Sequence, residues 1–293
     1  MSAPQSQSRP QSVRDYYYAH FPELLPDKQF HFATRIKNYF KTDDFSWFFA
    51  SYTPSQDLSA LLADNDFYHV NQLAARRPYF EKYVGLYGID AALFRVNHLL
   101  NEYHIDLRAE FLNLVPAARL YALADALLAD DGALTTLSTW AVNVICLTET
   151  LFPRGRNVGR ALAARALDLE TRTPNLDPLL LIYLYTHIIL CDTNFYTRPV
   201  SELDLSKQML DRCAAIIEQN FDQLILDVRI EFLVCANLVG VDYPALRARI
   251  AAECQENLAE HPFLVDSRRP ASYHTLDGAE HTNVLFIMSG LDA

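Results

Sequence analysis

The sequence predicts an all-α protein built of stacked helical hairpins, and three observations indicate this fold class. Glycine is scarce, with 8 residues in a chain of 293, whereas leucine and alanine are abundant. Leucine and alanine favour helices, while chains made of strands need many glycine-containing turns. No segment shows the period-2 alternation that a half-buried strand requires. A helical segment also recurs along the chain, which is typical of stacked hairpins.

The first 90 residues divide into two parts of different composition. Residues 1–12 are polar and lack an apolar core, which predicts a disordered tail and argues against a secretory signal. Residues 13–90 are rich in aromatic side chains and punctuated by prolines, which predicts an N-terminal region of short helices. Aromatic residues dominate protein cores, so we expect them to pack there. The alternative is that they form a surface for a peptide.

Residues 91–293 form the predicted helical-hairpin repeat domain. Asp131-Gly132 indicates a turn, Asp177-Pro178 and Tyr243-Pro244 start helices, and His261-Pro262 ends one. The predicted helices cover residues 89–104, 106–130 with a restart near Pro116, 133–152, 157–170, 178–191, 204–220, 222–239, 244–260 and 280–291.

Two of these helices are related by an internal repeat. Residues 140–152 align with residues 183–195 at an offset of 43, and under this alignment Glu149 meets Asp192. A period in the forties is the length of one helical hairpin, and such hairpins stack because none buries its apolar face alone. The expected architecture is an α/α toroid or a short α-solenoid. A coincidence between leucine- and alanine-rich helices is the alternative.

The charge and hydropathy of the chain exclude several classes of partner. The net charge is −11, whereas a nucleic-acid binder needs basic surface, so we expect no nucleic-acid partner. The same charge argues against an anionic membrane surface. The longest apolar run, residues 178–191, is too short to span a bilayer, so we expect no membrane association.

The cysteines predict a reducing compartment. There are five, an odd number, and no two are close in sequence. A reduced, cytoplasmic location is the simplest interpretation, with each thiol serving as a small core side chain rather than as a nucleophile. They are Cys146, Cys191, Cys213, Cys235 and Cys254.

The most unusual stretch for function is residues 183–196. An apolar helix here carries Thr186 and His187, and polar side chains in such a helix are costly unless they are satisfied or functional. His187 is the predicted general base or acid, and the alternative is that it donates to a carbonyl and packs. The polar residues that follow it are Asp192, Thr193, Asn194 and Tyr196.

A second polar cluster lies in residues 273–283. Asp277 and His281 are four residues apart and share a face if this segment is helical, while Glu280 lies near the expected helix start. The functional interpretation is a histidine–carboxylate group that meets His187 across a pit; the alternative is a polar loop that caps the last helix. The repeat places five polar residues on equivalent helices, which would converge on this pit: His98, Asn143, His187, Glu231 and His281.

From these clusters we predict the residues of a site. The candidate catalytic residues are His187, His281, Asp192 and Glu280. The candidate substrate-binding residues are Thr186, Tyr196, His274, Asp277 and Arg198. Arginines 154, 156 and 198 are further candidates to clamp an anion, and solvated loop charges are the alternative.

Motifs for known cofactors do not occur in the chain. There is no HExxH, no CxxC, no glycine-rich phosphate loop, no GxSxG and no dinucleotide fingerprint. A zinc site would take His187, His281 and one carboxylate, but no ligand motif supports it, so we predict no metal. The residues indicate no particular cofactor and no oligomeric state.

The segments 186–195 and 281–285 resemble a pattern of an uncharacterised family of helical bacterial proteins. In that pattern a Thr-His on an apolar helix is followed by Thr-x-Phe, and a later helix opens with His-Thr. The resemblance covers the C-terminal third to half of the chain. It implies an all-helical fold and a pairing of His187 with His281, and it implies no activity.

Two functional hypotheses follow. In the first, the protein is an enzyme with a histidine–carboxylate pocket, in which His187 acts as base or acid on a small polar or anionic substrate. In the second, it is a non-catalytic scaffold that binds a peptide or a partner protein. We favour the enzyme slightly. The ligand expected is a small molecule in the first hypothesis and a peptide in the second.

Overall fold

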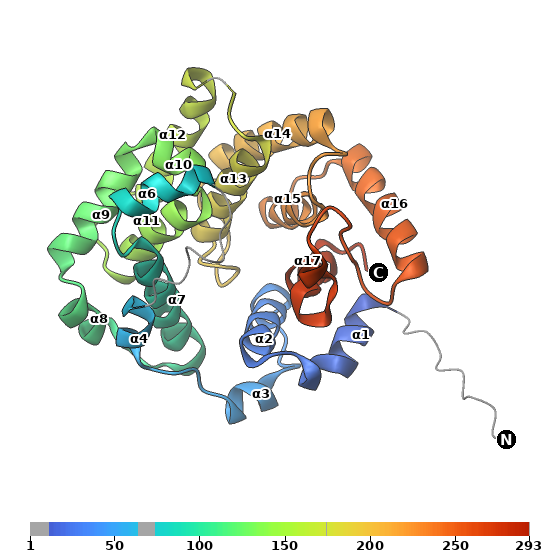
Figure 1. Cartoon of the computed structure of the whole chain (residues 1–293), viewed down its shortest axis with the longest axis horizontal. Coiled ribbons are helices and arrows are strands. Elements are labelled where there is room, and N and C mark those ends of the chain that lie inside the picture. The colour runs from blue at the N-terminus through green and yellow to red at the C-terminus, as the bar shows by residue number, and fades with distance from the viewer. Residues whose placement is uncertain (1–11, 64–73, 174, 293) are drawn as a thin grey trace. The chain divides into compact units, whose positions relative to one another are not determined.

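A computed structural model describes residues 12–63, 74–173 and 175–292, and over these residues the fold is all-α. About 75% of the chain is helical, and the described residues contain no strand (Figure 1). The expected tail, residues 1–12, lies outside the described residues except for Ser12, whose hydroxyl accepts a hydrogen bond from the Asp15 amide and caps α1.

The chain divides into two compact units. The first unit combines residues 1–43 with residues 217–293, and the second unit is the continuous segment 44–216. This division follows contacts rather than composition. Helix α7 (Leu86–Tyr103) runs without a break through residue 90, where the aromatic-rich region was expected to end.

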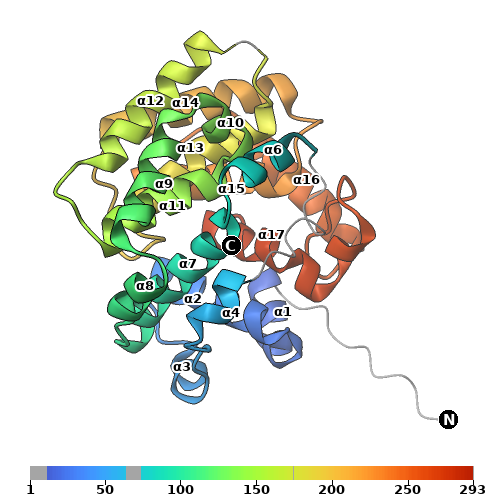
Figure 2. The same cartoon turned by 60° about the vertical axis from the view of Figure 1, so that its left-hand side comes forward.

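The second unit is an array of helices around three central ones. Helix α11 (Thr139–Leu151) packs against both α7 and α13 (Pro178–Asp192), and most side chains of these helices are buried. Figure 2 shows α7, α11 and α9 side by side. The other elements are α3 (Ser46–Ser51), α4 (Leu58–Ala63), η2 (Ala74–Arg76), α6 (Arg77–Lys82), α8 (Arg108–Leu114), α9 (Ala117–Ala129), α10 (Asp131–Leu137), α12 (Val158–Arg172) and most of α14 (Leu203–Asn220).

The first unit is built around α17 (Leu276–Ser289). This helix lies between α15 (Leu226–Val239) and α2 (Pro26–Phe40), as Figure 1 shows. Helices α15 and α17 are buried along most of their length, so their apolar side chains form the core of the unit. The remaining elements are α1 (Val13–His20), η1 (Phe21–Glu23), α16 (Pro244–Glu260) and η3 (Ala271–His274).

Several aromatic side chains before residue 43 belong to this core, although Phe40 is exposed. Tyr17 and Phe32 are completely buried and stack with their ring centroids 5.5 Å apart, and Phe21 packs beside them. These three aromatics pack as expected for core residues. In the second unit, by contrast, Trp47 remains 57% exposed.

Helices that the repeat equates pack together within each unit. In the second unit α7 packs on α11 and α11 on α13, while in the first unit α15 packs on α17. The predicted helix 133–152 was wrong in one respect, because Ser138 has a φ of 38° and separates α10 from α11. That all the hairpins together form an α/α toroid or a short α-solenoid stays a prediction.

Within the described residues, no single helix combines the length and apolarity needed to cross a membrane. Helix α13 is apolar but has only 15 residues. Helices α8 and α9 are long and apolar enough for a membrane span only when taken together, and they meet at a bend of 84°. The cytoplasmic location stays a prediction.

Candidate functional site

His281 and Asp227 form the centre of a polar site in the first unit. His281 lies on α17 and Asp227 at the start of α15, and the His281 Nδ1 is 2.7 Å from the Asp227 Oδ1. The Thr282 hydroxyl donates to the same carboxylate oxygen at 2.9 Å. An Arg269 guanidinium nitrogen lies 3.3 Å from the other oxygen. The carboxylate is therefore held by three groups from two segments.

These neighbours keep Asp227 ionised although it is almost completely buried. Burial by itself opposes ionisation, but the charge and hydrogen bond of His281, the Arg269 charge and the Thr282 hydroxyl outweigh it. Together they hold the pKa of the Asp227 carboxyl well below its usual value. Asp227 is thus a fixed negative charge against one nitrogen of an imidazole ring.

The His281 ring is accessible on its other side. Its side chain is 33% exposed, whereas that of Asp227 is 2% exposed. The Nε2 atom makes no hydrogen bond to any residue in the described part of the chain. A carboxylate on Nδ1 fixes the proton there and leaves the Nε2 lone pair available to take a proton from a bound molecule.

A second histidine–carboxylate pair lies beside the first. The His31 Nδ1 on α2 is 2.8 Å from the Oε1 of Glu280, which precedes His281 in the chain. The ring centroids of His31 and His281 are 5.5 Å apart. The Glu280 carboxyl is completely buried, and its Oε2 has no hydrogen-bond partner among the residues that the structure describes, so burial raises its pKa to about 7. The Glu280 carboxyl therefore titrates near neutral pH.

The local sequence explains why α17 presents these side chains. The Thr275 hydroxyl caps the helix by accepting from the Gly278 amide at 3.0 Å. A Cβ at Gly278 would lie 2.0 Å from the Ser272 carbonyl oxygen, so only glycine allows α17 to begin this close to η3. Asn283 then exchanges two hydrogen bonds with the Leu264 backbone, which ties the preceding loop to the helix.

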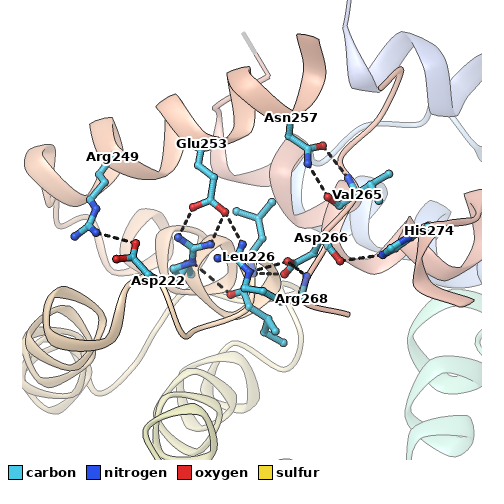
Figure 3. Close-up of polar contacts among 11 residues, drawn as sticks. Asp222, Leu226, Arg249, Glu253, Asn257, Val265, Asp266, Arg268 and His274 are labelled. Atoms are coloured by element: carbon cyan, nitrogen blue, oxygen red, sulfur yellow. Dashed lines mark hydrogen bonds and ion pairs between the residues drawn. The ribbon is translucent and has the colours of Figure 1, made fainter. Parts of the chain in front are cut away.

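A network of charged side chains positions the start of α15, where Asp227 lies (Figure 3). The Asp266 carboxylate accepts from the Leu226 amide at 2.5 Å and from the Arg268 side chain at 2.8 Å. Glu253 on α16 binds Arg268 and, through two hydrogen bonds of 2.6 and 2.8 Å, Arg229. The loop that carries Arg269 is thus fixed to both helices.

The structure places the other predicted residues of this unit in structural contacts. The His274 Nε2 lies 3.1 Å from the Asp266 carbonyl oxygen, as Figure 3 shows. The Asp277 carboxylate accepts from the Leu25 amide at 2.7 Å. Glu280 and His281 are thus the predicted residues that the site contains.

In the second unit, His187 lies in a separate polar cluster. Its Nδ1 is 3.4 Å from the Asn143 Oδ1, which also accepts from the buried Cys191 thiol at 3.7 Å. Asn143 hydrogen-bonds the buried Asp90, where burial raises the carboxyl pKa to about 8. Burial also raises the pKa of the Cys191 thiol, so this cluster lacks the thiolate that a cysteine nucleophile requires.

The residues predicted around His187 have defined positions. The Thr186 hydroxyl donates to the Ile182 carbonyl of its own helix at 3.0 Å. The Asp192 carboxylate accepts from the amides of Ser201 and Glu202, at 2.7 and 3.0 Å, and so braces the loop after α13.

The remaining two predicted residues of this unit lie in that loop. The Arg198 Nε donates to the Asp192 carbonyl at 2.8 Å. Tyr196 is buried with a φ of 73°, and its amide donates to the Thr193 hydroxyl. Among the other arginines proposed as an anion clamp, Arg154 and Arg156 both pair with Asp125 and Glu149.

His187 and His281 belong to different units, and their meeting in one pit stays a prediction. Sequence reasoning missed Asp227 and His31, which complete the two pairs in the first unit. Asp227 resembles an ordinary acidic residue in the first turn of a helix, and His31 stands between two phenylalanines. The distances along the chain, 54 and 249 residues, left no local signal for either pairing.

Among the described residues, no three histidine, cysteine, aspartate or glutamate side chains are grouped so that they could hold one metal ion. No protein-family model, no curated protein and no solved structure matches this chain.

Proposed function

We propose that this protein is an enzyme in which His281 transfers protons to and from a small polar or anionic substrate. The observation that supports this is the contact between the His281 ring, about one-third exposed, and the buried, ionised Asp227. In the proposed mechanism, the His281 Nε2 takes a proton from the substrate or from a water molecule. Asp227 orients the ring and stabilises the imidazolium that forms.

The His31–Glu280 pair is assigned a supporting role. Because Glu280 titrates near pH 7, this pair exchanges a proton within the range in which an enzyme operates. The His31 ring lies close enough to the His281 ring for one small substrate to contact both. Glu280, a predicted catalytic residue, thus acts through His31.

Local charge favours an anionic substrate. The whole chain is acidic, but Arg269 binds the Asp227 carboxylate, and Lys28 and Arg35 act electrostatically on Glu280. With the two imidazoles, five basic groups at the site face three acidic ones in the described part of the chain, Asp227, Glu280 and Asp27. A carboxylate or phosphate ester is the substrate class that such a site attracts.

The test uses p-nitrophenyl esters of carboxylic acids, phosphate and phosphodiesters with the purified protein. Asp227→Asn and His281→Gln are each expected to lower the turnover of the best substrate by about 10²- to 10⁴-fold, as removal of a general base does. His20→Gln is the control, because His20 bonds the Tyr16 carbonyl on α1 and lies outside the site.

A second measurement reports on His281 without any substrate. Diethyl pyrocarbonate acylates accessible imidazole nitrogens, and peptide mass spectrometry locates the modified ring. Only the neutral ring reacts, and Asp227 stabilises the imidazolium, so we expect the acylation of His281 to be faster in Asp227→Asn and unchanged in His20→Gln. If no ester is turned over and Asp227→Asn leaves the acylation of His281 unchanged, the enzyme proposal is wrong, and the non-catalytic scaffold is the better hypothesis.

A further inference from the structure

The second unit contains a cavity of about 330 Å³ beside the ends of α11 and α13. Its lining includes Cys146 from α11 and Cys191 from α13, two helices that pack directly against each other. Neither thiol belongs to a disulfide. The cavity therefore brings two reduced cysteines, far apart in sequence, to one solvent-accessible space.

The two thiols differ in the way that a peroxide-reactive pair requires. Cys146 is half-buried, whereas Cys191 is 3% exposed. Burial raises the pKa of the Cys191 thiol, and the adjacent Cys146 thiol raises it further. Cys146 is thus the thiol that a small oxidant reaches first, and Cys191 is a protonated neighbour held ready behind it.

We propose that Cys146 and Cys191 are a redox pair that a small peroxide converts into a disulfide across α11 and α13. The Cys146 thiolate attacks one peroxide oxygen, the O–O bond breaks, and the departing oxygen takes a proton to form water or an alcohol. The product is a sulfenic acid on Cys146. The Cys191 sulfur then attacks the Cys146 sulfur, the S–O bond breaks, and the proton of Cys191 leaves with the hydroxide as water. Two electrons pass from the thiols to the peroxide.

The surroundings fit this chemistry. Arg156 and Arg198 line the same cavity together with Glu149 and Asp192, so its wall is charged and admits a small polar oxidant. The cavity has room for a molecule the size of hydrogen peroxide. In the reducing compartment that the sequence predicts, the resting state is the dithiol, and the disulfide forms only on exposure to oxidant.

The test treats the full-length protein with one equivalent of hydrogen peroxide, followed by alkylation and peptide mass spectrometry without reduction. We expect a cross-linked peptide containing Cys146 and Cys191, a loss of the mass of two hydrogen atoms, and complete reversal by dithiothreitol. Because it uses the unmodified chain, this measurement does not depend on the folding of any variant.

Two variants and a control assign the steps. In Cys191→Ser the sulfenic acid on Cys146 persists and is trapped by dimedone, whereas Cys146→Ser gives no dimedone adduct. Cys213→Ser, at a buried cysteine of α14, leaves the cross-link unchanged. The proposal fails if Cys146 and Cys191 remain free after treatment, if Cys146 is oxidised without forming the link, or if another cysteine takes the place of either partner.

Discussion

Glu280 illustrates how the position of one residue sets its chemistry. Its buried carboxyl binds His31 through one oxygen, while the other oxygen has no hydrogen-bond partner in the described part of the chain, so burial raises the pKa of Glu280 to about 7. Between the ordinary value of 4.5 and about 7, the folded chain keeps a proton that the unfolded chain releases. The free energy of unfolding therefore falls as the pH rises through this window and stays low above it.

The amide of Glu280→Gln cannot ionise and should remove this dependence. Between pH 4 and pH 8 the unmodified protein is expected to lose about 3 kcal/mol more stability than the variant, in line with the size of the pKa shift. Urea unfolding at a series of pH values measures this difference. Glu256→Gln, at an exposed acid on α16, is the control and should follow the unmodified protein. Parallel curves for Glu280→Gln and the unmodified protein would contradict the assignment.

At this scale the sequence predicted one side of each pair. Glu280 and His281 stood out because titratable residues accumulate just before an apolar helix. Their partners Asp227 and His31 did not, because the packing of α15, α17 and α2 brings them together and local spacing carries no trace of that packing. His187, which also stood out in the sequence, contacts the side-chain amide of Asn143, and the same amide oxygen accepts a hydrogen bond from the buried Cys191 thiol.

Among the elements, the turn after α13 has the most unusual backbone. Asn194, Phe195 and Tyr196 are consecutive residues with φ values of 45°, 53° and 73°, a region in which non-glycine residues are strained. The Phe195 ring compensates by packing on Phe94 of α7, with centroids 4.7 Å apart. The turn directs the following chain back toward Asp192 on the helix.

Two substitutions at Phe195 separate the strain from the ring contact. Both Phe195→Ala and Phe195→Gly remove the ring, but only glycine relieves the backbone, so the glycine variant should be more stable by about 1 kcal/mol. Chemical denaturation measures the difference. The same two substitutions at Phe94, in the middle of α7, should show the opposite order, because glycine weakens a helix interior. A more stable alanine variant at both positions would refute the strain.

The helices themselves were largely predictable. Helix α16 begins at Pro244 and ends at Glu260. The pair Tyr243-Pro244 predicted its start, and His261-Pro262 predicted its end. The break at Ser138 was not predictable, because neither glycine nor proline marks the positive φ at this position. The repeat shows the same limit of prediction from sequence. Its apolar positions recur from one helix to the next, while each polar side chain has its own hydrogen-bond partners.

At the scale of the whole molecule, the two units differ in how the chain forms them. The second unit is continuous, whereas the first joins two segments from opposite ends of the sequence. Each has its own buried core, and the first also holds a buried arginine, Arg229, bound to Glu253. Breaking one partner of a buried ion pair leaves the other charge uncompensated, which destabilises a protein strongly.

Glu253→Ala leaves the fully buried Arg229 without its carboxylate and should therefore act on the first unit. We expect a loss of about 3–5 kcal/mol and faster amide hydrogen exchange in α15, α16 and α17, with α11 and α13 keeping their protection. Arg249→Ala removes an exposed pair with Asp222 and should cost less than about 1 kcal/mol. Equal acceleration of exchange in α11 and α13 would show that the two units open together.

The discontinuity of the first unit has a consequence for protein synthesis. His31 leaves the ribosome 249 residues before Glu280, with the whole second unit made in between. At about 5–20 residues per second, α2 waits roughly 10–50 s for α17, and its buried aromatic face stays uncovered for that time. The second unit is thus completely synthesised long before His31 can pair with Glu280. During this interval the uncovered apolar face of α2 is the surface that a chaperone would bind.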